Sequence, residues 1–336
     1  NQVGGWLCQP AGRTTFWAQT ESIRAVRALA PEVYRIPHYE RTAIMVEIDA
    51  DHFYVLDIFR VAGGREHVKF MHSNFGVLTL AGLVPDAAPD FSPGMGLMRN
   101  LRLDPAAQAG WRADWKIEDR YGLLKRPADI HLRYTDLTAG AEAGMVEGWI
   151  AAGPMSSTEE AWIPRLVIRR SSAAAPLVST FVGVIESCEG QGTIRAVRRV
   201  VLRDRAGAEY PDSNVAVEIE LSDGRRDLIV AKDIADPLEL NGAMGMDLIQ
   251  ADWQFSAAGG DIFWFRKDAA GAIIRLAKSR TSRMQVGAVE LHTDQYGNML
   301  ELAFENGRVR AAGATAVDSI EITKLLVAGR KQVPTQ

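Results

Sequence analysis

The chain has 336 residues, of which 47% are hydrophobic and 24% are charged, proportions typical of a folded globular protein. Its formal net charge of −4 provides no overall basic field, which argues against a nucleic-acid partner. It contains no run of about 18 apolar residues, no signal peptide, and no zinc-type spacing around Cys8 or Cys188, so we expect no membrane span and no metal held by these thiols.

The dominant pattern along the chain is that of short β-strands separated by turn residues. Apolar and polar residues alternate, or apolar β-forming residues run together, in the segments 43–59, 162–170, 179–187, 194–204, 215–221, 227–231, 261–279 and 299–313. Helical periodicity is scarce, and the proline-rich region 76–110 is predicted to be a long loop with at most a short helix. We therefore predict an all-β fold, a large antiparallel multi-stranded β-sandwich of stacked sheets with a short helix or two. Residues 1–336 form one such region, with a soft seam near 76–110.

The segment 53–72 reads FYVLDIFRVAGGREHVKFMH and predicts a tight β-hairpin around Gly63 and Gly64. If these glycines are the central turn residues, Asp57 faces Phe70, and His72 lies diagonally across on the same face. Asp57 and His72 would then form an acid/base or ligand pair, or Asp57 would simply be satisfied by a neighbouring side chain. A carboxylate buried in an apolar strand needs a partner in either case, and we favour the structural interpretation. Zinc at this hairpin is disfavoured because the second histidine, His67, lies on the other face.

The segment 34–48 carries His38 and Arg41 at the start of a predicted strand. An arginine can bind a carboxylate through two parallel hydrogen bonds, so Arg41 suits an acidic ligand. The alternative is a surface arginine paired with Glu40 or Glu47.

Other residue types give weaker signals. The arginines between 195 and 203 alternate with apolar residues, which is typical of a solvated strand face. Trp111 and Trp115 suit either sugar stacking or core packing, and we favour the core. No glycine-rich segment has phosphate-loop spacing, and no serine or thiol nucleophile motif is present.

The residues of 31–72 resemble the C-terminal β-region of the heparinase II/III-like polysaccharide lyases. The matching positions are His38, Arg41, Asp57, Phe59, Arg60, Gly63, Gly64, His67 and His72, followed later by Arg169, Arg170, Phe181, Ile185 and Glu186. The resemblance extends over roughly 20–310. It implies stacked antiparallel sheets that follow an N-terminal α/α toroid, and a β-elimination on uronic-acid glycans such as heparan sulfate or alginate.

The resemblance also sets expectations for this chain's role. The toroid is absent, and the family's zinc segment is expected upstream of Asn1, so we expect no cofactor in this segment and no catalytic residue that can be numbered here. The substrate-binding candidates are His38, Arg41 and His72, while Asp57, Gly63 and Gly64 are assigned structural roles. Expected partners are an anionic polysaccharide and the upstream toroid, in a bacterial periplasmic or secreted setting. The alternatives are a non-catalytic carbohydrate-binding or scaffolding β-sandwich, and a lyase that acts alone through an unrecognised site.

Overall fold

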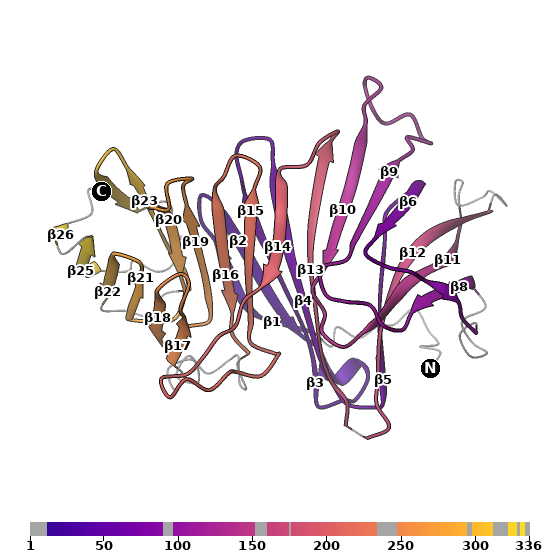
Figure 1. Cartoon of the computed structure of the whole chain (residues 1–336), viewed down its shortest axis with the longest axis horizontal. Helices are drawn as coiled ribbons and strands as arrows, with labels where there is room; N and C mark the ends of the chain where they lie inside the picture. Colours follow the sequence, from indigo (N-terminus) through magenta and orange to yellow (C-terminus); the bar gives the residue numbers. More distant parts are fainter. Residues whose placement is uncertain are drawn as a thin grey trace. The chain divides into compact units, whose positions relative to one another are not determined.

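A computed structural model describes residues 12–89, 97–151, 160–174, 176–233, 247–293, 298–311, 322–327 and 330–332 (Figure 1). Within these ranges the regular secondary structure consists of β-strands, apart from a short 3-10 helix at Pro31–Val33. The strand pairs described within each unit are antiparallel, which confirms the predicted all-β class. The chain divides into two compact units, 1–48 with 194–336 (unit 1) and 49–193 (unit 2).

Unit 1 contains three sets of strands. The first set is β1 (Arg13–Gln19), β2 (Ile23–Leu29) and β3 (His38–Glu47). The second is a sheet in the order β14 (Ile194–Arg199), β15 (Val215–Leu221), β16 (Arg226–Ala231), β19 (Ile262–Lys267), β20 (Ile273–Lys278), β23 (Leu300–Glu305) and β24 (Arg308–Ala311). The third is a sheet in the order β17 (Asp247–Gln250), β18 (Phe255–Ala258), β21 (Arg283–Val286), β22 (Val289–Thr293), β25 (Ile322–Val327) and β26 (Arg330–Gln332).

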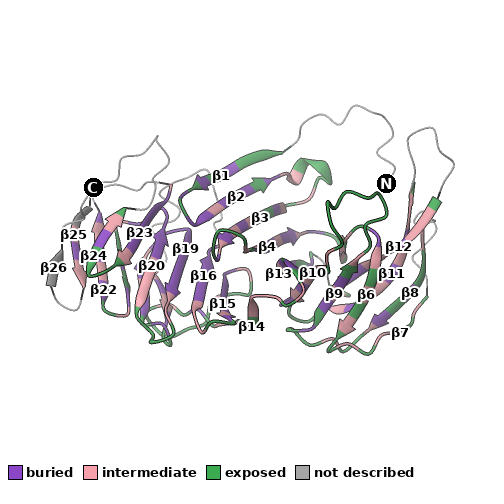
Figure 2. Cartoon of the chain, turned by 90° about the horizontal axis from the view of Figure 1, so that it is seen from above, coloured by how far each residue is buried: buried purple, intermediate pink, exposed green. Residues whose placement is uncertain are grey.

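The main apolar core of unit 1 lies between the second and third sheets. Phe263 and Phe265 of β19 pack with Phe255 of β18, with ring centroids 5.0 Å apart in each case. β19 is buried on both faces for nearly its whole length (Figure 2). The face of β19 that points away from the third sheet is covered by the strands β1 to β3.

Polar contacts hold the layer of β1, β2 and β3 against the second sheet, which is the middle sheet of unit 1. The Glu301 carboxylate of β23 accepts hydrogen bonds from the Thr20 hydroxyl at 2.5 Å and the Ser22 backbone at 2.9 Å. Arg266 of β19 pairs with Asp227 at 2.7 Å and donates to the backbone carbonyl of Glu47. Unit 1 is thus a three-layer stack in which one sheet is covered on both sides.

Unit 2 contains two facing sheets. One has the order β4 (Phe53–Ala62), β13 (Val178–Glu189), β10 (Ile130–Asp136), β9 (Arg112–Ile117) and β6 (Gly76–Ala81). The other has the order β5 (Glu66–His72), β12 (Glu160–Ser171), β11 (Glu142–Ala151), β8 (Met98–Asp104) and β7 (Asp86–Ala87). Trp111 and Trp115 are 3% and 0% exposed in the core between them, so their predicted core packing is confirmed.

The predicted hairpin at 53–72 is wrong, because β4 and β5 belong to different sheets. β4 pairs with β13, and β5 pairs with β12. The backbone of Gly63 and Gly64 exchanges hydrogen bonds with Leu177 in the connection between β12 and β13, at 2.9 and 3.0 Å. The turn therefore carries the chain across from one sheet to the other and lies beside a second turn that does the same. Side chains of β4 and β5 consequently meet across the sandwich, and the pairing of Asp57 opposite Phe70 does not occur.

The prediction of a long loop at 76–110 is also wrong. This region contributes β6, β7 and β8, while residues 90–96 lie outside the described ranges. Pro85 and Pro89 lie on either side of β7, and Pro105 directly follows β8, so these prolines lie outside the strands and their missing N–H groups break no ladder.

Candidate functional site

The two faces of the β1 to β3 layer have different surroundings. Phe16, Ile23, Ile44 and Val46 are buried on the inner face, which packs on the middle sheet of unit 1. Successive side chains in a strand point to opposite faces, so residues that alternate with these lie on the outer face. His38 and Arg41 differ by an odd number of positions and therefore lie on opposite faces of β3.

The inner face carries a buried ionic cluster centred on Asp261. Its carboxylate binds the Arg27 guanidinium through both oxygens, at 2.7 and 2.9 Å, and also Arg280 at 3.2 Å. Glu40 lies 3.5 Å from Arg27 on the same face. Burial alone would lower the pKa of Arg27, but Asp261 and Glu40 outweigh it and raise the pKa. The cluster joins β2 and β3 to the start of β19.

His38 lies at the rim of this cluster. Its Nε2 atom is 3.9 Å from Glu40, and its side chain is 26% exposed. The structure thus places His38 with the buried charges and not with Arg41.

The outer face presents Trp17, Val26, Ala43 and Arg41. Trp17 of β1 pairs with Val26 of β2, which pairs with Ala43 of β3, and Arg41 follows two positions away on the same face. Trp17 is 58% exposed and Arg41 is also exposed. The strand spacing and residue rise place their backbones about 12 Å apart, with only the short side chains of Val26 and Ala43 between them.

Two tyrosines extend the outer face. Tyr39, two residues before Arg41, packs on Tyr34 with ring centroids 5.1 Å apart. Burial raises the pKa of Tyr39, and the neighbouring Tyr34 adds to this effect. Glu47 forms an ion pair with Arg24, and Glu40 lies 3.5 Å from Arg27.

This outer face combines an exposed aromatic ring with an exposed guanidinium. An exposed tryptophan ring offers a flat apolar surface with a polar edge, which suits the C–H face of a pyranose. A guanidinium offers the paired donors that a uronate carboxylate accepts. Trp17 was not among the residues predicted from the sequence. The alternation in RTTFWAQ places its side chain on the other face of the strand from the buried Phe16, and this pattern could have identified it.

The other predicted residues lie in unit 2. Asp57 is 2% exposed and forms an ion pair with Lys69 of β5 at 2.8 Å, and Lys69 donates to the Tyr134 hydroxyl at 3.4 Å. His72 is exposed, and its Nδ1 atom lies 3.0 Å from the Ser73 carbonyl oxygen. The buried Asp57 carboxylate is thus paired with Lys69, whereas His72, considered above as its partner, lies exposed beside Ser73.

His67 is placed at the turn between β4 and β5. Its Nε2 lies 2.6 Å from the Gly63 carbonyl oxygen, and its Nδ1 lies 2.8 Å from the Ser179 hydroxyl. Burial lowers the pKa of His67, in spite of the opposing contact with Gly63. Gly64 has φ of +61°, in the left-handed region that favours glycine. These contacts give the glycines and His67 a clear part in shaping the turn.

The described residues contain no group of three or more His, Cys, Asp or Glu side chains able to hold a metal. Within the same ranges, no helix is long and apolar enough to cross a membrane. Cys188 is a buried free thiol, while Cys8 lies outside the described residues.

Comparisons with known proteins give only distant likenesses. No protein-family profile matches the chain, and neither does any curated protein. Among solved structures, a heparan sulfate lyase HepC mutant from Pedobacter heparinus has 16% identity and a TM-score of 0.38, covering 68% of this chain and 28% of its own. A heparinase III has 8% identity and a TM-score of 0.37, with 62% and 26% covered. The chain therefore spans little more than a quarter of the length of these enzymes.

Proposed function

We propose that this chain is the β-sheet portion of a polysaccharide lyase and that it binds uronic-acid glycans on the outer face of β1 to β3. The observation that carries the proposal is the shared exposure of Trp17 and Arg41 on one sheet face. An aromatic ring beside a guanidinium provides one contact for a sugar ring and one for its carboxylate. The resemblance of the segment 31–72 to the heparinase II/III-like lyases supplies the substrate class.

The catalytic part of the reaction is assigned to an upstream helical region. β-Elimination requires neutralisation of the uronate carboxylate, a base for the C5 proton and an acid for the leaving oxygen. Arg41 suits the first role, but His38, the nearest histidine in sequence, lies on the opposite face of β3. We propose a periplasmic or secreted setting, where such polysaccharides occur.

An elimination assay tests the division of labour between the two parts. The isolated chain is added to alginate or heparan sulfate, and the absorbance of unsaturated uronate is followed. We expect no rise from the chain alone and a rise when it is recombined with a helical upstream part. Activity of the isolated chain would contradict the assignment, and glycan binding without activity in the recombined protein would support the non-catalytic alternative.

A further inference from the structure

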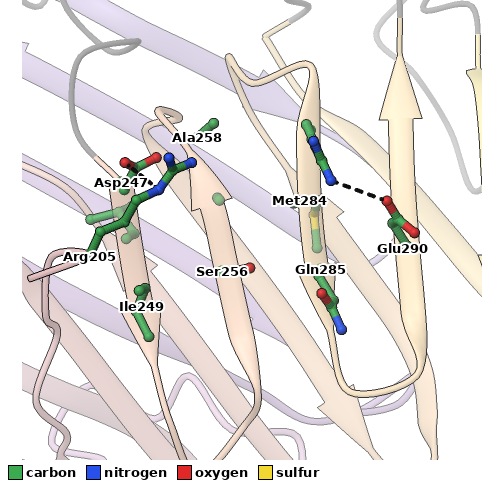
Figure 3. Close-up of a pocket in the computed structure, with 11 residues that line it drawn as sticks. Arg205, Asp247, Ile249, Ser256, Ala258, Met284, Gln285 and Glu290 are labelled. Carbon is green, nitrogen blue, oxygen red and sulfur yellow. Dashed lines mark ion pairs between the residues drawn. The ribbon is translucent and has the colours of Figure 1, made fainter. Parts of the chain in front are cut away.

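A concave site lies on the outer face of the third sheet of unit 1. It is a pocket of about 350 Å³ lined by residues of β17, β18, β21 and β22 together with Arg205 (Figure 3). This volume lies at the lower end of the range for small-molecule sites. The pocket does not involve Trp17, Arg41 or any residue of β1 to β3.

The pocket is a groove because the strand in its middle carries short side chains. Ser256 and Ala258 of β18 form the floor, with Asp247 and Ile249 on one side and Gln285 on the other (Figure 3). In the strand register, Asp247 is the partner of Ala258, and Ser256 is the partner of both Ile249 and Gln285. These side chains therefore line up across the neighbouring strands. The flanking backbones of β17 and β21 lie about 10 Å apart, wide enough for one sugar ring.

Two arginines stand at the sides of the groove. Arg205 contacts Asp247 through Nε at 2.8 Å and is 76% exposed. Because a guanidinium has five N–H donors, pairing through Nε leaves its terminal nitrogens for a ligand. On the other side, Arg283 is 67% exposed and lies 3.6 Å from Glu290, beyond a normal hydrogen bond.

Glu290 does not neutralise its side of the groove. It accepts from His292 at 2.7 Å and has Lys324 at 3.8 Å in addition to Arg283. One carboxylate thus faces two permanent cations and a histidine. The balance of charges around Glu290 therefore favours an anionic ligand. Arg283 is exposed, so its side chain can reach such a ligand.

We propose that the groove along β18 is a second glycan site, specific for a sugar that carries a carboxylate or sulfate group. Arg283 and Arg205 bind the anionic group from opposite sides, and Ser256 and Gln285 bind ring hydroxyls. The class of ligand rests on the proposed function, but the site is separate from the outer face of β1 to β3. Two sites on one unit would raise the affinity for a long polysaccharide above that for a single sugar, because the second contact becomes intramolecular.

Methyl-resolved NMR titration tests this site with two probes, D-glucuronate and D-glucose, which differ in the carboxylate. Ile249 and Ala258 report the groove, while Val26 and Ala43 report the outer face of β1 to β3. We expect glucuronate to shift the Ile249 and Ala258 signals and glucose to bind at least fivefold more weakly. Equal binding of the two sugars, or no shift at Ile249 and Ala258, would overturn the proposal.

Substitutions then identify the groups that bind the anion. We expect Arg283→Ala to weaken glucuronate binding at the groove at least fivefold and Arg283→Lys to weaken it less. Arg195→Ala is the matched control, since Arg195 is 70% exposed and paired with Glu220 at 3.0 Å much as Arg205 is with Asp247. An unchanged affinity in both Arg283→Ala and Arg205→Ala would overturn the proposal. Shifts at Val26 and Ala43 without shifts at Ile249 and Ala258 would refute the groove alone and leave the proposed function standing.

Discussion

The carboxylate of Asp57 lies 2.8 Å from the Lys69 ammonium, and both side chains are buried between the two sheets of unit 2. Lys69 in turn contacts the Tyr134 hydroxyl, which donates to Asp136 at 2.7 Å. Burial raises the pKa of Asp136, although its hydrogen bonds from Tyr134 and Thr138 oppose this effect. Asp57 and Lys69, which belong to the segment 53–72, are therefore part of a chain of buried polar side chains that links the two sheets of unit 2.

Replacing Lys69 with methionine should destabilise the protein strongly. The substitution leaves the Asp57 carboxylate buried without its cation, which typically costs about 3–5 kcal/mol. The free energy of unfolding is measured by urea denaturation. The double variant Asp57→Leu, Lys69→Met serves as the control and should recover much of the loss. A loss under about 1 kcal/mol in the single variant would show that the ion pair does not support the fold.

His67 and His72 should differ in their effect on stability. His67→Ala removes contacts with Gly63 and Ser179 and leaves buried partners unsatisfied, so we expect a loss of about 1–3 kcal/mol. His72 is exposed, and His72→Ala should change stability by less than about 0.5 kcal/mol. Thermal and urea unfolding of the two variants provide a direct comparison. Equal effects would contradict the assignment of His67 to the turn.

Lys278 should make stability depend on pH in the alkaline range. Burial lowers the pKa of Lys278 to about 7 from 10.5, while its ammonium contacts the Thr281 carbonyl and the Thr293 hydroxyl. Above the folded pKa, the unfolded state binds more protons than the folded state, so stability rises between about pH 7 and about pH 10. Below about pH 7, Lys278 is protonated in both the folded and the unfolded state, and the added stability is absent. The full change is on the order of 5 kcal/mol.

The variant Lys278→Met isolates this contribution. Its free energy of unfolding should rise less between neutral pH and about pH 10 than that of the unsubstituted protein. Buffers of matched ionic strength separate the effect from charge screening. An identical pH dependence in both proteins would exclude Lys278 as its source.

The strand content could be predicted from alternation, but the partners of β4 and β5 could not. A Gly-Gly turn between two strand-like runs is compatible with a hairpin or with a turn that crosses between sheets. The decision depends on Leu177, more than a hundred residues away, whose backbone accepts a hydrogen bond from Gly63 and donates one to Gly64. The same long-range arrangement brings Lys69 to Asp57. No local sequence pattern predicts this contact.

The candidate sites show the same limit. Strand parity places Trp17 opposite Phe16 and separates His38 from Arg41, so these relationships were accessible from the sequence. The groove of Arg205, Ser256 and Arg283 was not, because it needs strands β17, β18 and β21 to be placed side by side.

The affinity of variants for alginate oligosaccharides tests whether Trp17 and Arg41 form the proposed glycan-binding face. The dissociation constant is measured by isothermal titration calorimetry for the unsubstituted chain, Trp17→Ala and Arg41→Ala. The exposed residues Tyr121 and Arg195 provide the matched controls Tyr121→Ala and Arg195→Ala. We expect Trp17→Ala and Arg41→Ala each to bind roughly tenfold more weakly, at unchanged melting temperature, while the controls bind normally. Unchanged affinity in both Trp17→Ala and Arg41→Ala would contradict the proposal.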